Sequence, residues 1–246
     1  MLPARVLVRA GELFGISEGT LRVALSRMVA AGELEPADGS FRLAGRRLDR
    51  QARQEASRAA TTRAWRGQAW RFAFVAGERR SAEQRGELRA AMRALRLAEL
   101  REGVWLRPDN LRVDDGADAA AVVAEQCVQA VGKLTGLGEG DVVGGVRDAD
   151  MASRLWDVAG WARRAGELRR SLGRSLPRVE AGRAEELAAG FVLSADVLRH
   201  FQADPLLPDE LLPEDWPGAA LRAEYAAWDR AYRALLRGWW KHPDSP

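Results

Sequence analysis

The sequence predicts a multidomain α+β protein with an N-terminal winged helix-turn-helix, a central ferredoxin-like α+β domain and a mainly α-helical C-terminal domain. Three observations support this prediction. Over residues 1–45, two amphipathic helical patterns flank a short glycine-containing turn and precede a hairpin signal. Strand-like alternation recurs over residues 67–148, and helical periodicity dominates residues 149–246, with a polar linker helix expected over 46–66. A chain of 246 residues is long enough for each domain to bury a core of its own.

Two short helices joined by a tight turn are expected at the N-terminus. Pro3 suits the first turn of a helix, and Gly15 ends that helical pattern. Ser17 then occupies the N-cap position of a second helix that ends near Gly32. The first helix has apolar residues at three- and four-residue spacing, namely Val6, Leu7, Ala10, Leu13 and Phe14. The second has a stripe that we expect to be buried, namely Leu21, Ala24, Leu25, Met28 and Val29.

A hairpin is expected to close this first unit. Leu34 to Leu43 has strand character, and Asp38-Gly39 is a strong turn signal because both central positions of a type I′ turn need a positive φ. Residues 46–66 follow, rich in Arg and Ala and poor in large apolar side chains. This composition indicates an exposed helix or linker between domains.

Strands and helices alternate in the middle domain. The expected elements, in order, are strand Ala69–Ala76, helix Ser81–Leu95, strand Gly103–Arg107, helix Ala117–Val131 and strand Asp141–Val146. A single sheet with helices on one face would satisfy this order, which is why we expect a ferredoxin-like arrangement.

The C-terminal domain has a helical pattern from Met151 onward. Its helical segments are one that contains Leu155, Trp156, Val158, Ala159 and Trp161, then Glu185–Phe201, then Ala219–Trp240. The last two are separated by residues 204–218, where four prolines prevent a continuous helix while the apolar residues need burial. We therefore expect an ordered, packed loop there.

Composition argues against several classes of protein. No apolar run approaches the about 18 residues of a membrane span, and the start has no signal-peptide h-region, so we expect a cytoplasmic protein without membrane contact. Cys127 is the single cysteine, which excludes an internal disulfide, and its apolar neighbours predict a buried position on a helix. His200 and His242 are the only histidines and no HExxH or CxxC spacing occurs, so we expect no bound metal.

Basic charge is concentrated near the N-terminus. Residues 1–66 contain 12 Arg against 7 Asp or Glu, a balance of +5, while the whole chain is +3 and the remainder therefore −2. Such an asymmetry suits a module that faces phosphates, although an Arg-rich composition also follows from base bias in a genome.

Three stretches resemble the PaaX family, named for the repressor of phenylacetate degradation. The first is FGISEGTLRVALSRMVAAGEL, from Phe14 to Leu34, which is similar to that family's winged-helix core and is the most specific. The second is the strand GVWLRP, from Gly103 to Pro108, similar to the family's central segment. The third runs from Leu206 to Gly218 and is similar to the family's proline-rich run before a final helix.

The resemblance implies a DNA-binding repressor released by an acyl-CoA effector, typically phenylacetyl-CoA, held by the middle and C-terminal domains. The family has a further helix ahead of the pattern that begins here at Met1, so we expect the DNA-binding unit to lack that helix. The family's middle domain also resembles a nuclease of CRISPR adaptation, whose strand ends on an acidic metal ligand. Here the strand ends Phe74-Val75-Ala76-Gly77, without a carboxylate.

The second helix is the predicted recognition helix, because its apolar stripe leaves a polar face for the major groove. Arg22 is the expected base contact, Ser26 lies one turn later on the same face, and Arg27 is expected to reach phosphate. We expect a homodimer that binds two half-sites of a double-stranded operator. The predicted DNA-binding residues are Ser17, Glu18, Gly19, Thr20, Arg22, Ser26 and Arg27, with Arg42, Arg46 and Arg47 near the wing.

Alternative interpretations remain open from the sequence. Arg22 and Arg27 could simply be solvated, and a winged-helix-derived protein could bind a partner or ligand without binding DNA. The pairs Arg79-Arg80, Arg163-Arg164 and Arg169-Arg170 could contact CoA phosphates or be solvated helix faces, and most of the nine Trp are expected in the core. An enzyme is not expected, because His200 has apolar neighbours and no Ser or Cys motif around it.

Overall fold

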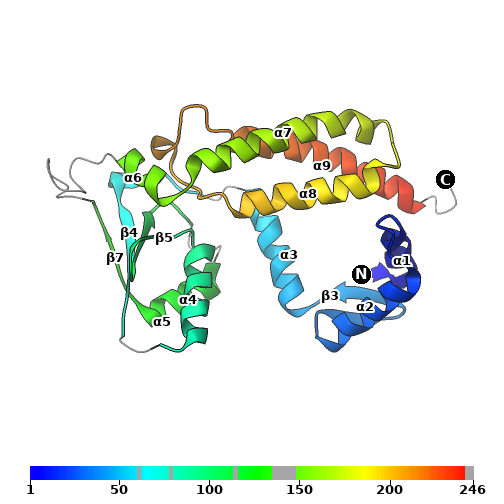
Figure 1. Cartoon of the computed structure of the whole chain (residues 1–246), viewed down its shortest axis with the longest axis horizontal. Helices are drawn as coiled ribbons and strands as arrows, with labels where there is room; N and C mark the ends of the chain where they lie inside the picture. Colours follow the sequence, from blue (N-terminus) through cyan, green and yellow to red (C-terminus); the bar gives the residue numbers. More distant parts are fainter. Residues whose placement is uncertain (60–61, 78–79, 113–115, 135–147, 242–246) are drawn as a thin grey trace. The chain divides into compact units, whose positions relative to one another are not determined.

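The structure, a computed structural model, describes residues 1–59, 62–77, 80–112, 116–134 and 148–241. It is a mixed α+β fold with two antiparallel sheets (Figure 1). Its contacts divide the chain into two units. The helical unit consists of Met1–Ala59, Arg164–Ala203 and Pro217–Pro246, and the sheet unit of Ala60–Arg163 and Asp204–Trp216.

The head, defined as residues 1–44, combines two helices with a small three-stranded sheet. Its elements are β1 (Leu2–Pro3), α1 (Ala4–Glu12), α2 (Glu18–Ala30), β2 (Leu34–Ala37) and β3 (Ser40–Leu43), with the strand order β1-β3-β2. The predicted hairpin is confirmed, and Asp38 and Gly39 have φ values of 45° and 71°, as a turn with two positive φ angles requires. Pro3 was expected inside the first helix. It is instead extended and pairs with Ser40, so the helix begins at Ala4.

The apolar face of α2 is narrower than the sequence predicts. Leu25 is buried, while Leu21, Met28 and Val29 are half-buried. Ala24, predicted to belong to the buried stripe, is exposed. A helix that packs mainly on α1 and β2 covers a limited arc, so a position at the edge of the stripe stays in solvent.

Helix α3 (Gly45–Arg58) follows the head and packs against α8. The expected linker helix over 46–66 is therefore helical only in its first part. Arg58, at the end of α3, donates from Nη1 to the Asp229 carboxylate at 2.7 Å. This helix is thus attached to the rest of the helical unit and is not a free linker.

In its described residues, the rest of the helical unit is formed by three long helices: α7 (Val158–Glu180), which belongs to this unit from Arg164 onward, α8 (Glu186–Gln202) and α9 (Gly218–Lys241). Trp228 and Phe201 are fully buried among them. Trp228 donates from Nε1 to Ser175 Oγ at 3.0 Å, and its ring stacks on Tyr232. The Tyr232 hydroxyl donates to the Leu187 carbonyl at 2.6 Å, and burial raises the pKa of Tyr232 to about 12.

The helical segment predicted around Leu155 and Trp161 is interrupted. Helix α6 (Asp148–Leu155) ends before Trp156, and α7 begins at Val158. Asp157 lies between them and accepts from the Gly160 backbone N–H at 2.8 Å, which caps the new helix.

The described residues of the sheet unit form four antiparallel strands. The sheet and its two helices are, in chain order, β4 (Trp70–Val75), α4 (Ala82–Ala94), β5 (Ala98–Arg101), β6 (Val104–Pro108), α5 (Ala117–Gln126) and β7 (Cys127–Gly132). The unit also includes α6 and two short 3₁₀ helices, η1 (Arg66–Gln68) and η3 (Asp209–Leu211). The sheet order is β5-β6-β4-β7. Helices α4 and α5 pack together, and Met92 and Val123 lie at the centre of the core they form with the sheet.

The helix predicted over Ala117–Val131 is wrong in its second half. It ends at Gln126, and Cys127 begins strand β7, so Cys127 is buried as predicted but lies on a strand. The reason is pairing with β4, in which Phe74 opposes Val128 and Arg71 opposes Val131. Pairing with the distant strand β4 therefore overrides the local helical pattern. The strand expected at residues 141–146 lies outside the described residues.

The proline-rich loop is ordered and packed, as predicted. Leu207 and Leu211 are buried with Trp65, Trp70 and Leu106 in a second core of the sheet unit. The loop is held by the Leu206 carbonyl, which accepts from Arg107 Nη2 at 3.1 Å and from Asn110 Nδ2 at 2.9 Å. Both of these side chains are buried, and burial lowers the pKa of Arg107 to about 9.

Candidate nucleic-acid interface

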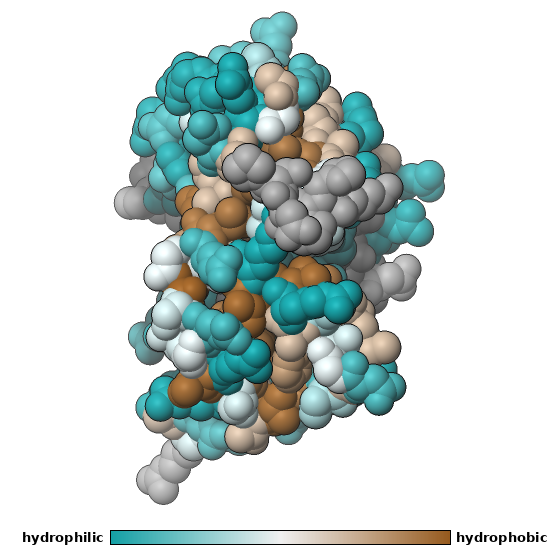
Figure 2. Space-filling view, turned by 90° about the vertical axis from the view of Figure 1, so that its right-hand side faces the viewer, coloured by the Kyte–Doolittle hydropathy of each residue, from teal (hydrophilic) through white to brown (hydrophobic). Residues whose placement is uncertain are grey.

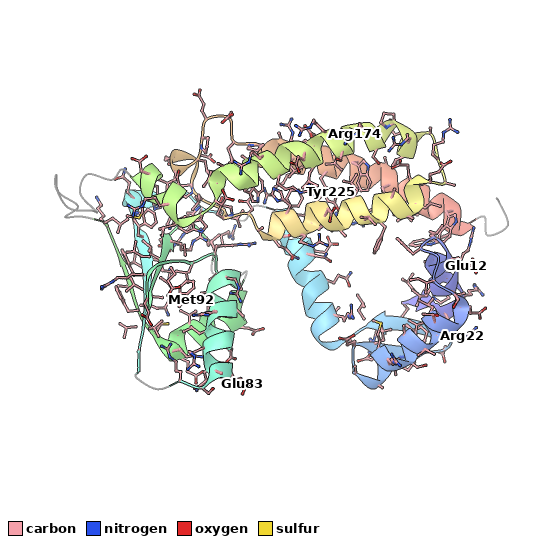
Figure 3. The ribbon with its side chains drawn as sticks, in the orientation of Figure 1. Glu12, Arg22, Glu83, Met92, Arg174 and Tyr225 are labelled. Atoms are coloured by element: carbon pink, nitrogen blue, oxygen red, sulfur yellow. The ribbon has the colours of Figure 1, made fainter. Side chains whose placement is uncertain are left out.

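The polar side of α2 is open to solvent. All seven residues predicted to bind DNA in and before this helix are exposed: Ser17, Glu18, Gly19, Thr20, Arg22, Ser26 and Arg27. Leu25 of the same helix is buried, and Figure 3 shows Arg22 on this helix. An α-helix with one packed side and one free polar side has the form that enters a major groove.

The start of α2 is held by its cap. Ser17 Oγ accepts from the Thr20 backbone N–H at 3.3 Å, and its oxygen lies 2.9 Å from the Thr20 hydroxyl. The preceding turn is closed by the Ile16 N–H, which donates to the Gly11 carbonyl at 3.0 Å. A Cβ on Gly11 would lie 3.3 Å from Leu21 Cδ2, so a small residue permits α1 and α2 to approach closely. These local contacts position the exposed side of α2.

Arg22 is engaged within its own helix. Its Nη2 lies 2.6 Å from Glu18 Oε1, and its Nε donates to the same oxygen at 2.8 Å. The Arg22 side chain is 64% exposed, and an exposed pair of this spacing contributes only about 0.3–0.5 kcal/mol. Such a pair orders the arginine without preventing it from exchanging partners.

The arginines near the hairpin are also paired with carboxylates. Arg42 on β3 forms an ion pair with Glu35 on β2, and Arg47 Nε lies 2.9 Å from Glu33 Oε2. The Arg46 side chain lies outside the described part of the chain. Arg42 and Arg47 lie in or beside the hairpin, as predicted. The structure adds an acidic partner to each of them.

A shallow depression adjoins the exposed side of α2. It is lined by Arg22, Leu25 and Ser26 of α2, and by Ala4, Val8 and Phe41 from α1 and β3. Of these six, only Arg22 and Ser26 were predicted to be at the interface. Ala4, Val8 and Phe41 come from other elements, and nothing in their local sequence distinguishes them from ordinary core positions.

The head is attached to the long helices through two aromatic contacts that the sequence did not indicate. Arg9 lies over the Trp239 ring, and the rings of Phe14 and Phe191 meet edge to face with centroids 5.4 Å apart. Both contacts lie within the helical unit. Arg9 is near the end of α1, and Phe14 lies in the turn that follows this helix. Figure 2 shows apolar residues exposed among hydrophilic ones, and Phe14 and Phe191 are both exposed apolar side chains.

Two of the other candidate arginines have acidic partners. Arg164 pairs with Glu167 and Arg169 pairs with Glu224, both on the helical unit. Among the described residues, no group of His, Cys, Asp and Glu could hold a metal ion, and no helix is both long and apolar enough to cross a bilayer.

Two protein-family models match this chain, one over the N-terminal head and one over the C-terminal helices. A family model described as PaaX-like protein matches residues 1–47, and one described as PaaX-like protein C-terminal domain matches residues 156–242. The chain belongs to the PaaX-like family. Membership of the PaaX-like family, which comprises regulators rather than enzymes, indicates a transcriptional regulator.

This PaaX-like chain also resembles a solved structure. That structure is the uncharacterized protein Rv0674 from Mycobacterium tuberculosis, with 38% sequence identity and a TM-score of 0.66. The match covers 96% of this chain and 92% of the other. No curated protein matches the chain in sequence.

Proposed function

We propose that this PaaX-like protein is a transcriptional repressor that binds double-stranded DNA through a winged helix-turn-helix head. The observation that carries the proposal is the exposed polar side of α2, which is capped by Ser17 and backed by the buried Leu25. The wing is the hairpin of β2 and β3. Arg22, Ser26 and Arg27 are the α2 residues that approach the DNA.

Arg22 is the proposed base contact. A guanidinium donates to both the O6 and N7 acceptors of guanine, and such a bidentate contact provides about 1–3 kcal/mol of discrimination. Because the Glu18 pair contributes less than that, exchange of Glu18 for a base edge is favourable. Released Glu18 lies one turn from Arg22 and is placed to accept from a cytosine amino group.

The sheet unit is proposed to be ferredoxin-like. Its element order is β-α-β-β-α-β, and its sheet places the first and third of these strands, β4 and β6, side by side at the centre. The end of β4 and the next two residues, Ala76 and Gly77, carry no carboxylate, so the proposal includes no nuclease reaction.

A homodimer in the cytoplasm is the proposed working form. A single head offers few phosphate contacts, and a two-fold dimer that binds two half-sites supplies the affinity that an operator needs. The proposed effector is an acyl-CoA of the aryl type, such as phenylacetyl-CoA, whose binding releases the operator. Family membership supports this assignment.

Immunoprecipitation of the protein with its bound chromosomal DNA, followed by gel-shift assays on the recovered fragments, tests the proposal. We expect nanomolar binding that weakens steeply as salt rises, because phosphate contacts release counterions. Addition of phenylacetyl-CoA should release the fragment. Recovery of no specific fragment, with binding no tighter than to random DNA, would instead support a protein that binds a partner or ligand without DNA.

A further inference from the structure

A groove of about 260 Å³ lies between α7 and α8 of the helical unit. Ser171, Arg174 and Arg178 line it from α7, and Glu186, Val192 and Asp196 line it from α8. Figure 3 labels Arg174 on α7. The predicted DNA-binding residues are all elsewhere, so the groove takes no part in the proposed contact with DNA.

Both carboxylates of the groove already have cationic partners. Glu186 is buried and accepts from Arg178 Nε at 2.5 Å and from the Ser175 hydroxyl at 2.5 Å. Asp196 accepts from Arg199 Nη1 at 2.7 Å and lies 3.8 Å from Arg164. The negative charge of the groove is therefore compensated before any ligand binds.

Arg174 differs from these residues. Its Nη2 donates to Ser171 Oγ at 3.1 Å, and no carboxylate among the described residues forms an ion pair with it. The charge of Arg178 is balanced by Glu186, but its side chain is 58% exposed and keeps further N–H groups at the rim. The rim of the groove therefore presents guanidinium N–H groups and a hydroxyl, which are the donors that bind carboxylates and phosphates.

Between Glu186 and Asp196, the α8 wall of the groove is apolar. Ala189, Val192 and Leu193 form it, and Val192 is 53% exposed. A cationic rim beside an apolar wall is the composition of a site for an amphipathic anion. The groove is smaller than the about 300–1,000 Å³ of sites that enclose a drug-sized ligand, so it holds one oxyanion and a short apolar segment.

We propose that this groove is an effector subsite that binds the oxyanion of a small amphipathic ligand, a carboxylate or a phosphate. Arg174 and the Ser171 hydroxyl bind the oxyanion, and the apolar part of the ligand covers Val192. The proposal rests on the proposed function, since it locates the effector of the regulator. A ligand as large as an acyl-CoA places only one of its phosphates or its acyl end here.

The groove lies next to a contact with the DNA-binding head. Phe191 precedes Val192 on α8, and its ring contacts Phe14, which lies in the turn before α2. A ligand that packs on Val192 therefore acts on α8 one residue from the contact with the head. This gives the ligand a physical route to the orientation of α2.

Titration calorimetry on the full-length protein tests the subsite with three probes: inorganic phosphate, phenylacetate and phenylacetyl-CoA. Binding by phenylacetate alone identifies the carboxylate as the recognised group, and competition by phosphate identifies a phosphate. Arg174→Gln should weaken binding of the effective probe at least about tenfold, since a charge-assisted pair is lost. Arg230→Gln, an exposed arginine of α9 that does not line the groove, should leave it unchanged.

Gel shifts on the same proteins separate this inference from the proposed function. Arg174→Gln should bind the operator normally and no longer respond to the probe. Absence of operator binding in every protein, with probe binding still dependent on Arg174, refutes the regulator and retains the subsite. Equal probe affinity of Arg174→Gln and the unaltered protein, or no binding of any probe at millimolar concentration, overturns the subsite. Circular dichroism and melting temperature confirm that the variants fold.

Discussion

The guanidinium of Arg9 lies over the indole ring of Trp239, 4.2 Å from its centroid, and its Nη1 donates to the Trp239 backbone carbonyl at 3.0 Å. The two residues stand 230 positions apart in the chain. This contact attaches the first helix of the head to the last helix of the protein. The orientation of the head therefore depends on contacts made by α9 as well as on the head's own small core.

Removal of the Trp239 ring should loosen this attachment. Trp239→Ala leaves the carbonyl acceptor in place but loses the cation–π contact and the buried area of the ring, a loss of about 1–3 kcal/mol in the free energy of unfolding. Urea denaturation measures it. Trp240→Ala is the matched control. Trp240 is 42% exposed, so its replacement should lower the free energy of unfolding much less. A double-mutant cycle with Arg9→Ala that gives no coupling energy would contradict the contact.

Arg22→Ala should remove discrimination between the operator and random DNA while the fold is unchanged. The lost Glu18 pair costs at most about 0.5 kcal/mol of stability, whereas a lost guanine contact reduces specificity by about 1–3 kcal/mol. Competition gel shifts with operator and random duplexes measure the ratio of affinities. Arg89→Ala, an exposed arginine on α4 in the sheet unit, should retain full specificity. An unaltered ratio in Arg22→Ala would show that another residue contacts the bases.

Loss of the Ser17 cap should destabilise the head. Ser17→Ala removes the acceptor of the Thr20 N–H and should cost about 0.5–2 kcal/mol, because that donor then has no partner in the protein. Hydrogen exchange of the Thr20 and Leu21 amides measures the local effect. Ser17→Asn restores a capping oxygen and should recover most of the stability. Equal protection in the Ala and Asn variants would refute the cap.

Asn110 should be necessary for the ordered proline-rich loop. Its Oδ1 accepts from Arg107 Nη2 at 2.7 Å, and its Nδ2 donates to the Leu206 carbonyl. Asn110→Ala leaves a buried guanidinium short of one acceptor and should cost about 1–3 kcal/mol. Limited proteolysis within residues 204–216 and urea denaturation measure the effect. Arg112→Ala, exposed two positions later, is the control and should change neither.

Cys127 should react slowly with thiol reagents in the folded protein. Burial raises the pKa of its thiol, so at a given pH less thiolate is present than in the unfolded chain, and access is limited because the residue is 8% exposed. The rate should rise with pH, and at any pH it should stay below the rate in urea. Ellman's reagent reports this without ambiguity, since the chain has a single cysteine. Equal rates in buffer and in urea would contradict the buried strand position.

Local signals predicted the parts of the fold that depend on neighbouring residues. Ser17 as a cap, Asp38-Gly39 as a hairpin turn and Ser81 at the start of α4 all involve groups within a few positions of each other. The exposed polar residues of α2 were predicted for the same reason, because helical spacing alone places Leu21, Leu25 and Met28 together on the side that packs.

What depended on distant partners could not be predicted. Cys127 begins a strand because β4 supplies its hydrogen bonds, although Ala117 to Val131 has a helical pattern. The choice between buried Trp228 and exposed Trp240 is likewise made by packing, since both lie on one helix. Thus the sequence by itself determined the caps, the turns and the exposed polar residues of α2, through interactions of residues close in the chain. Only the tertiary structure decided the β7 strand, the Arg9–Trp239 attachment and the Arg174 groove, because each requires side chains or backbones that are far apart in the chain to meet in space.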